Sequence, residues 1–315
     1  MDLPALAARV RAHPGLAAKL ALAPVAAALG GDGDDAAVLG TGEEGHLVLA
    51  AEAVWPPFVA GNPRAAGVAG VVTVLNDLAA TGARPLALLD TVVCADPDTA
   101  REVLDGLRAG AALYGVPVVG GHTTVQAVRE PGLSTFALGR ARVPLRAGNA
   151  QAGDAVSLLA CVEGELVGGV GQASFFSHLR GPRRGHAAAD LALLPEAGEA
   201  GEAWAARDVS MPGIVGSLVQ LCEAAGGLGC AVDVTGVPLP RGVALERWLV
   251  TFPSYGFLVV GDPDALARRA GAAGLVCAVL GTLDDSGVVR LRGADGEEPV
   301  WDLGAEPLTG LGPSR

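Results

Sequence analysis

The segment 62–82 restricts the possible folds of this chain more than any other stretch. Asn62 and Pro63 supply an N-cap and a first-turn proline, so a helix is predicted from residue 63 to about residue 81, ending at Gly82. This helix carries alanine and glycine in its first turns and is apolar on nearly every side. A helix without a polar face must be buried against a sheet.

Strands and helices alternate on both sides of the middle of the chain. Two short helices broken at Pro14 are predicted in 3–29, and a hairpin pairs 38–39 with 47–49. Further strands are predicted at 86–93, 116–119, 134–142, 155–162, 231–234 and 257–260, further helices at 97–114, 212–225, 243–249 and 263–273, and β-rich segments at 276–303. The alternation predicts an α/β (α+β) fold of two lobes. Pro and Gly interrupt any helical or strand periodicity in 143–153. We therefore expect a domain boundary there, with domains at 1–148 and 149–315.

Composition excludes several classes of function. A net charge of -12 and a pI near 4.8 argue against binding to nucleic acid or an anionic membrane, because both need a positive field. Lys19 is the only lysine, so lysine-based mechanisms and a lysine phosphate loop are nearly excluded. The 5 cysteines are scattered without a Cys-x-x-Cys pair, which is typical of reduced thiols in a cytoplasmic protein.

Three carboxylates gather in the glycine-rich turn 31–36, at Asp32, Asp34 and Asp35. Carboxylates this close repel one another unless a cation offsets their charge. Three other interpretations are open: a dinucleotide fingerprint, whose acids would repel a pyrophosphate; a calcium loop, which has alanine where a ligand and a glycine are needed; and a plain solvated turn.

Asp77 lies near the end of the predicted buried helix. A carboxylate in such a position costs several kcal/mol unless cations or donors compensate it. Exposure at the helix end, or pairing with Arg84, is the simpler explanation for Asp77 alone. Together with Asp34 and Asp35, it predicts a shared magnesium site that could bridge phosphates.

Two further motifs are candidate ligand sites. Gly120, Gly121, His122 and Thr123 follow the buried strand predicted at 116–119, where glycines allow a ligand close to the backbone, although a tight turn would look the same. The segment 207–213 precedes a predicted helix whose first amides could bind an anion. Asp208 or Ser210 could equally be an ordinary helix cap there.

Three motifs together resemble the aminoimidazole ribonucleotide synthetase-like (PurM-like) superfamily, which includes thiamine-monophosphate kinase, selenophosphate synthetase and HypE. They are Gly33-Asp34-Asp35-Ala36-Ala37-Val38-Leu39, Asn76-Asp77-Leu78-Ala79-Ala80-Thr81-Gly82-Ala83-Arg84-Pro85 and Gly120-Gly121-His122-Thr123. Their order and spacing match over most of the chain. The segment 146–154 is similar to the lobe junction of that group, and 208–213 to its second-lobe acidic motif.

The resemblance implies an N-terminal sheet lobe that forms a homodimer and a C-terminal α/β lobe, with ATP and Mg2+ in the cleft. It implies phosphoryl transfer from ATP to, or activation of, an oxygen of a small metabolite. Asp34, Asp35, Asp77 and Asp208 would be magnesium ligands, with Glu52 close to metal or substrate. The nucleotide would meet Asp77, Asp208, Ser210 and the segment 120–123. The catalytic residues would be Asp34, Asp35, His122, which would contact phosphate or substrate, and Arg84, with Arg207 as an alternative to Arg84.

The chain departs from the kinase members of that superfamily at three positions. His122, Val74 and Met211 stand where those kinases usually carry Asp, Asn and Asp, so potential oxygen ligands are lost. Around 208–216 and 252–257 the chain is similar to an uncharacterised AIR-synthase-related branch. Thiamine-monophosphate kinase is therefore one alternative function, and a non-catalytic nucleotide-binding or scaffolding homodimer is another. The acceptor and the role of 163–206, a candidate lid or substrate loop, are open.

Overall fold

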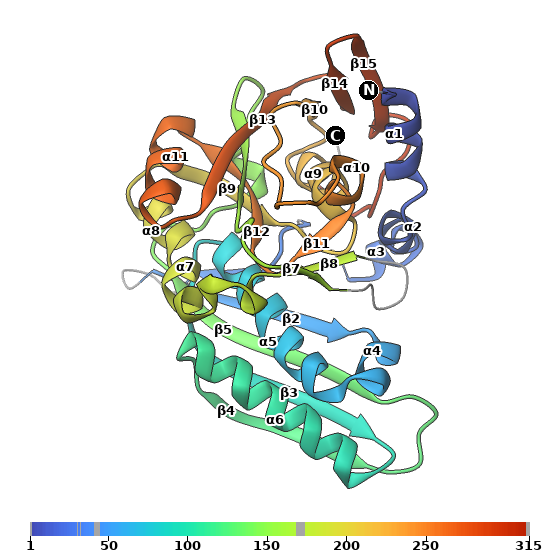
Figure 1. Ribbon diagram of the computed structural model, residues 1–315, viewed down its shortest axis with the longest axis vertical. Coiled ribbons are helices and arrows are strands. Elements are labelled where there is room, and N and C mark those ends of the chain that lie inside the picture. The colour runs from blue at the N-terminus through green and yellow to red at the C-terminus, as the bar shows by residue number, and fades with distance from the viewer. Residues whose placement is uncertain (1, 30, 32, 41–44, 168–173, 313–315) are drawn as a thin grey trace. The chain divides into compact units, whose positions relative to one another are not determined.

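The computed structural model describes residues 2–29, 31, 33–40, 45–167 and 174–312, so Asp32 lies outside the described residues (Figure 1). The chain forms two compact units. Unit 1 comprises Met1–Asp34, Leu145–Pro182 and Ala197–Arg315, and unit 2 comprises Asp35–Pro144 and Arg183–Glu196. These units differ from the predicted continuous domains 1–148 and 149–315 in the segments 1–34, 145–148 and 183–196, and the division into domains stays a prediction.

Unit 2 is built on one mixed sheet with the strand order β1-β2-β5-β3-β4. Its strands are β1 (Ala37–Gly40), β2 (His46–Val54), β3 (Arg84–Cys94), β4 (Val118–Val125) and β5 (Gly132–Ala141). Its helices are α4 (Pro56–Gly61), α5 (Pro63–Ala80), α6 (Pro97–Tyr114), α7 (Ala187–Leu191) and the first part of α8 (Leu193–Glu199). The predicted hairpin is confirmed, because β1 pairs antiparallel with β2.

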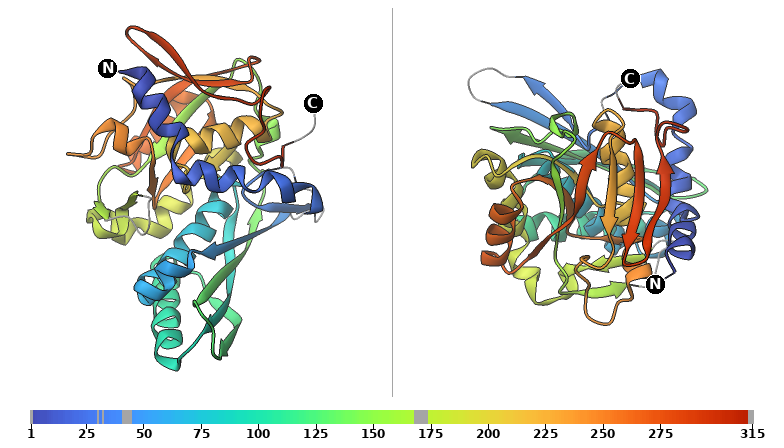
Figure 2. Two further views of the ribbon diagram at one scale, coloured as in Figure 1. Left: turned by 90° about the vertical axis from the view of Figure 1, so that its right-hand side faces the viewer. Right: turned by 90° about the horizontal axis from the view of Figure 1, so that it is seen from above.

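Helix α5 is buried as its composition predicts. The Asn62 side chain accepts a hydrogen bond from the Ala65 amide at 3.2 Å, and Pro63 occupies the first turn. Helices α5 and α6 cover the same face of the sheet (Figure 2). Their backbones touch, because a Cβ on Gly67 would lie 2.2 Å from the Val103 carbonyl oxygen and one on Gly106 would lie 2.1 Å from the Arg64 carbonyl oxygen. The small residues thus allow the close helix packing that removes α5 from water.

The opposite face of this sheet, the outer face, carries exposed apolar side chains. Leu39 on β1, Leu49 on β2, Phe136 on β5 and Leu89 on β3 are all more than a third exposed. Their strand partners show that they share one face, since Leu89 lies opposite Phe136 and Phe136 lies opposite Ala51. An apolar face of this kind is typical of a surface that another molecule covers.

The strand predicted at 116–119 is wrong in its end and in its burial. The observed strand β4 runs from Val118 to Val125, so Gly120–Thr123 lie inside a strand and not in a turn after it. Most of β4 is exposed. The physical reason is its position, because β4 pairs only with β3 at the edge of the sheet and two consecutive glycines bring no side chains to bury.

Unit 1 contains a seven-stranded sheet with the order β15-β14-β10-β13-β6-β12-β9 and a three-stranded sheet with the order β11-β8-β7. The strands are β6 (Ala155–Ala160), β7 (Glu165–Val167), β8 (Ser174–Ser177), β9 (Ala203–Asp208), β10 (Gly229–Asp233), β11 (Thr251–Pro253), β12 (Gly256–Gly261), β13 (Val276–Asp284), β14 (Val288–Gly293) and β15 (Gly296–Asp302). The helices are α1 (Leu3–Arg11), α2 (Pro14–Leu20), α3 (Ala23–Leu29), α9 (Gly213–Ala224), α10 (Leu245–Trp248) and α11 (Pro263–Ala272), with short 3-10 helices at Ala147–Asn149 and His178–Arg180. A further 3-10 helix, Pro182–His186, lies almost wholly in unit 2.

The core of unit 1 forms around α9. Ile214 and Leu218 of this helix are buried in one cluster with Leu158 of β6, Leu258 of β12 and Trp248 of α10. Helices α1 and α2 contribute Leu6 and Leu16 to the same cluster, although they lie far away in sequence. The N-terminal segment therefore packs with the second half of the chain, which local sequence patterns do not predict.

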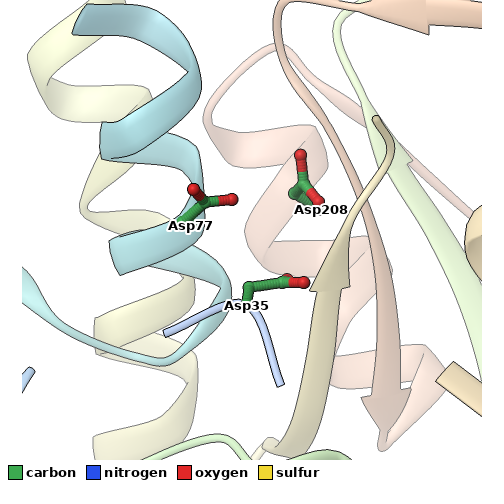
Figure 3. Close-up of side chains that lie close together, drawn as sticks. All are labelled: Asp35, Asp77 and Asp208. Atoms are coloured by element: carbon green, nitrogen blue, oxygen red, sulfur yellow. The ribbon is translucent and has the colours of Figure 1, made fainter. Parts of the chain in front are cut away.

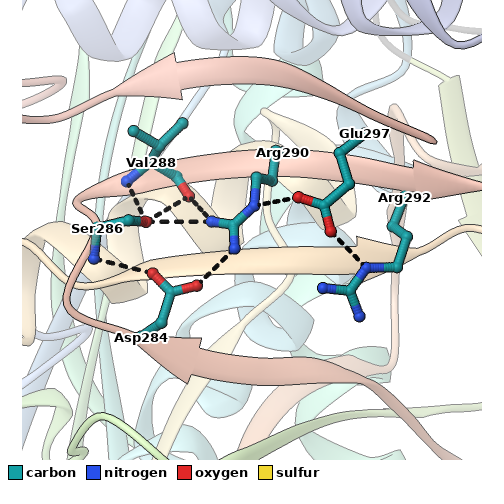
Figure 4. Close-up of polar contacts among 6 residues, drawn as sticks. All are labelled: Asp284, Ser286, Val288, Arg290, Arg292 and Glu297. Atoms are coloured by element: carbon teal, nitrogen blue, oxygen red, sulfur yellow. Dashed lines mark hydrogen bonds and ion pairs between the residues drawn. The ribbon is translucent and has the colours of Figure 1, made fainter.

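An ion-pair network at one end of the large sheet fixes the last hairpin (Figure 4). Arg290 of β14 donates to Asp284 at 2.8 Å and to Glu297 at 2.6 Å, and Arg292 donates to the second oxygen of Glu297 at 2.6 Å. Hydrogen bonds from Arg292 and Arg290 hold the pKa of Glu297 below its usual value.

Within the described parts of the chain, no helix is both long enough and apolar enough to span a membrane.

Candidate metal and nucleotide site

Asp77 lies on the last turn of α5 and is only 5% exposed. The turn is tightened by Thr81, whose hydroxyl donates to the Asp77 carbonyl oxygen at 3.0 Å. Burial of Asp77 confirms the expectation from the apolar helix and makes exposure at the helix end the wrong explanation. A buried carboxylate requires compensation by donors or a cation.

Asp35 supplies a second carboxylate next to Asp77 within unit 2. It precedes β1, is half-buried, and offers a carboxylate oxygen within 4.8 Å of one from Asp77 (Figure 3). Two carboxylates at this separation repel each other, and a hard cation that both oxygens contact would remove the repulsion. Carboxylate oxygens are ligands of the kind that Mg2+ takes, and the magnesium site stays a prediction. The predicted place of Glu52 near the metal or substrate stays a prediction.

Asp34 has different surroundings from its neighbour. In unit 1 its two oxygens accept hydrogen bonds from the Ala147 amide at 2.8 Å and from the Arg146 guanidinium at 3.4 Å. The preceding Gly33 carbonyl accepts from the Arg207 guanidinium at 2.7 Å. These contacts give Asp34 a structural role at the start of the 3-10 helix Ala147–Asn149, which local sequence does not reveal. Its predicted role as a metal ligand stays a prediction.

Asp208 is the last residue of β9 in unit 1 and is 4% exposed. The Ser210 amide that follows donates to the Ser217 hydroxyl of α9 at 3.0 Å. Helix α9 begins at Gly213, whose φ of +73° and close approach to Val250 exclude a side chain. The helix start that the sequence predicts here is confirmed, whereas strand β9 before it was not predicted. The predicted metal-binding role of Asp208 and nucleotide-binding role of Ser210 are untested.

The segment 120–123 does not approach Asp35 within the sheet of unit 2. Strands β1 and β4 are the two edges of that sheet, separated by four strand spacings, or roughly 19 Å. His122 lies opposite Thr91 and alternates with Gly121, so its side chain is on the outer face. There its Nε2 lies 3.1 Å from the Thr124 hydroxyl. Within unit 2, His122 therefore does not lie beside the Asp35 and Asp77 carboxylates.

Arg84 and Glu52 occupy different parts of the sheet. Arg84 begins β3, whereas His122 pairs with Thr91 farther along that strand, so the two lie about 20 Å apart at the usual rise per residue. One phosphoryl group could therefore not contact both Arg84 and His122 of the same chain. Glu52 pairs with Thr135, whose hydroxyl donates to the Gly70 carbonyl at 2.8 Å, and so is on the face that α5 covers.

Two buried acidic residues escaped the sequence predictions. Asp90 lies on β3 opposite Thr135 and is 5% exposed; burial raises the pKa of its carboxyl. Glu223, at the end of α9, is 7% exposed and accepts hydrogen bonds from a segment more than eighty positions later. The signal for Asp90 was an acidic residue within an apolar strand. Glu223 had no such signal, because its donors are distant in sequence.

Comparisons with known proteins agree with this fold. The N-terminal domain of AIR synthase related protein matches residues 33–141, and the C-terminal domain matches residues 151–293. A Synechocystis protein, Uncharacterized protein sll0787, is 31% identical over 297 residues, covering 89% of this chain and 86% of that protein. This relative confirms the resemblance to an uncharacterised branch that the sequence motifs indicate.

Solved structures share the fold. T. maritima PurL complexed with ATP has a TM-score of 0.72 and 20% identity over 89% of this chain, which spans only 47% of that PurL chain. AaThiL complexed with AMPPCP and TMP has a TM-score of 0.65 and 17% identity, covering 85% of this chain and 93% of that one. These similarities confirm the predicted PurM-like fold of mixed helix and sheet. With both domains matched in order, the chain belongs to the AIR synthase related protein family.

Proposed function

We propose that this protein binds ATP with Mg2+ and transfers a phosphoryl group to an oxygen of a small metabolite. The observation that carries the proposal is the proximity of the Asp35 and Asp77 carboxylates, one half-buried and one buried. Hard cations take oxygen ligands and bridge phosphates, so this pair suits a metal-bound nucleotide. The presence of a single lysine supports the same conclusion, because phosphate charge must be offset by other means.

In this proposal Asp35 and Asp77 hold the metal, which when bound would neutralise charge on the phosphates. Asp208 and Asp34 are further candidate ligands, and Glu52 is a candidate contact for metal or substrate. Arg84 or Arg207 would stabilise the transferring phosphoryl group. Asp208 is buried at a strand end just before α9, which is a suitable position for a ligand residue.

The family and the solved neighbours support nucleotide binding. Neighbours of the same fold are structures of T. maritima PurL with ATP and of AaThiL with AMPPCP and TMP. Their substrates differ, so the acceptor of this protein cannot be taken from the fold. Thiamine-monophosphate kinase is the specific alternative, and the positions of His122, Val74 and Met211 argue against it because each lacks an oxygen ligand.

The other alternative is a non-catalytic nucleotide-binding or scaffolding homodimer. Isothermal titration with AMPPCP in the presence and absence of Mg2+ measures binding, and ADP release with thiamine monophosphate and a panel of hydroxylated metabolites measures turnover. We expect Mg2+-dependent binding, its loss in Asp77→Asn, and no change in the exposed control Asp295→Asn. Absence of Mg2+-dependent binding by the wild type would exclude the enzyme proposals. Binding without turnover on any acceptor would favour the scaffold.

His122 and its neighbours need a separate test. A role of Gly120, Gly121, His122 and Thr123 at the nucleotide remains a proposal, because one unit places them at the far edge of the sheet from Asp35. If His122 contacts phosphate, His122→Ala will weaken AMPPCP binding at saturating Mg2+. If AMPPCP affinity is unchanged while Asp77→Asn abolishes binding, His122 has no such role.

We also propose that the protein forms a homodimer through the outer face of the unit 2 sheet. The exposed Leu49, Leu89 and Phe136 of adjacent strands support it, since a second copy would remove them from water. Light scattering should give twice the 31.3 kDa mass of one chain. Phe136→Glu should reduce that mass to one chain, whereas Leu239→Glu, at an exposed site in unit 1, should not. A monomeric wild type would refute this interface.

A further inference from the structure

A single buried carboxylate in unit 1 holds the segment Leu308–Gly312, which we call the strap. Glu223 Oε1 accepts from the amides of Leu308 at 2.8 Å and Gly310 at 3.1 Å. Its Oε2 accepts from the Thr309 amide at 2.9 Å and the Thr309 hydroxyl at 2.6 Å. Hydrogen bonds to an ionised acceptor are stronger than neutral ones, so Glu223 is the main polar anchor of the strap.

The strap has a defined conformation around this anchor. The Leu311 amide donates to the Thr309 hydroxyl at 3.2 Å, and Gly310 adopts a left-handed φ of +70°. Gly312 packs on the Glu223 backbone, because a Cβ there would lie 2.4 Å from the Glu223 carbonyl oxygen. Leu308 and Thr309 are buried. The strap is therefore held in one conformation by α9.

The other side of the strap contacts the acidic turn. A Cβ on Gly33 would lie 3.5 Å from the Leu311 carbonyl carbon and 3.2 Å from the Ala224 Cβ, so Gly33 faces both the strap and the end of α9. Gly31 faces the Leu311 side chain, since a Cβ on Gly31 would lie 3.7 Å from Leu311 Cδ2. The strap thus forms one wall against which the turn rests.

Gly33 has little conformational restriction of its own. Its φ of +78° is a left-handed conformation that glycine enters and leaves freely. Arg207 binds its carbonyl, and the Ala147 amide and Arg146 bind the next residue, Asp34. The strap lies next to the same turn, as a further neighbour besides these hydrogen bonds. Ordering the turn before ligands bind removes an entropy cost from binding.

We propose that Glu223 is a positioning residue that acts through the strap to hold the turn 33–34, from which Asp35 continues towards Asp77. The inference rests on the proposed function for its effect on Mg2+, but the coupling between Glu223 and the turn stands without it. Glu223 touches neither nucleotide nor metal in this account. Its loss should therefore weaken Mg2+ binding and leave the chemical step intact.

Hydrogen–deuterium exchange on the ligand-free protein tests the coupling, with Glu223→Gln compared to the exposed control Glu246→Gln. We expect Glu223→Gln to speed exchange in peptides covering both 308–312 and 31–36, and the control to change neither. The apparent KM for Mg2+ should rise about threefold to tenfold, while kcat at saturating Mg2+ and ATP stays near that of the wild type. Thr309→Val, which removes the hydroxyl donor alone, should reproduce a smaller change of the same kind.

Faster exchange in 308–312 with unchanged exchange in 31–36 would overturn the proposal, because the strap would then be loosened without effect on the turn. If Glu223→Gln does not fold, Thr309→Val serves in its place. Faster exchange in both 308–312 and 31–36 supports the proposal, and faster exchange in 308–312 alone overturns it. A wild type that fails to bind Mg2+ with AMPPCP would refute the proposed function, and coupled exchange of both peptides would still support the positioning role. The two failures are thus distinguishable.

Discussion

The carboxyl group of Asp90 lies directly on the backbone of Gly121, so that a Cβ built on Gly121 would be 2.4 Å from Asp90 Oδ2 and 2.7 Å from Cγ. The two residues are partners across the parallel strands β3 and β4. The glycine thus leaves room for an acidic side chain on the face that α5 and α6 cover. This contact explains the second glycine of the Gly120-Gly121 pair without a ligand.

Gly121→Ala should destabilise unit 2 by about 1–3 kcal/mol, because its methyl group would meet both the Asp90 side chain and, at 2.9 Å, the Asp90 carbonyl oxygen. The matched control is Gly120→Ala, where a Cβ would meet only the Leu89 Cδ2 at 3.3 Å, and the change should stay within about 0.5 kcal/mol. Urea denaturation of both variants measures the difference. Equal stabilities of the two would show that the Asp90 contact is not restrictive.

Asp90 should make stability depend on pH in a defined direction. Burial raises the pKa of its carboxyl in the folded state, so the protonated form favours folding. This contribution is fully present below the pKa of the unfolded chain and is lost as pH rises through the folded pKa. Asp90→Asn should therefore melt above the wild type at neutral pH, with a difference that shrinks towards pH 4. A pH-independent difference would contradict the assignment, and Asp295→Asn serves as the exposed control.

A buried ion pair in unit 2 should matter more than an exposed one. Arg183 Nε donates to Asp190 at 3.1 Å, and both side chains are largely buried. Asp190→Ala leaves the guanidinium without this partner and should cost about 3–5 kcal/mol. The exposed pair of Arg101 with Asp98 is the control, and Asp98→Ala should cost less than about 1 kcal/mol. Thermal melts that rank the two variants in the reverse order would be inconsistent with the burial.

Local signals predicted the two long helices of unit 2, α5 and α6, well, whereas the short helices α4, α7 and α8 were not predicted. Asn62-Pro63 and Asp96-Pro97 both cap helices that begin at the proline, and α6 spans the predicted range 97–114. These signals are local, because a cap needs only a side chain and a free amide a few residues away. The burial of Asp77 was predictable for the same reason, since the apolar periodicity surrounds it on its own helix.

Tertiary contacts decided what the sequence could not predict. Gly120-Gly121 is typical of a turn, but pairing with β3 makes it part of an edge strand. Asp34 and Asp35 are adjacent and alike in sequence, yet one caps a 3-10 helix and the other faces Asp77. Glu223 accepts its hydrogen bonds from the strap, which lies beside it only in the folded chain. Each outcome depends on residues that are distant in sequence.

Asp35 and Asp77 are proposed to hold one cation together, and a double-mutant cycle distinguishes one shared site from two independent contacts. Mg2+-dependent AMPPCP affinity is measured by calorimetry for the wild type, Asp35→Asn, Asp77→Asn and the double variant, after melting curves confirm folding. Two ligands of one ion should each lower the affinity by at least about tenfold, and the double variant should lose much less than the sum, because the site is already broken. Additive losses, or an unchanged affinity in either single variant, would contradict a shared site.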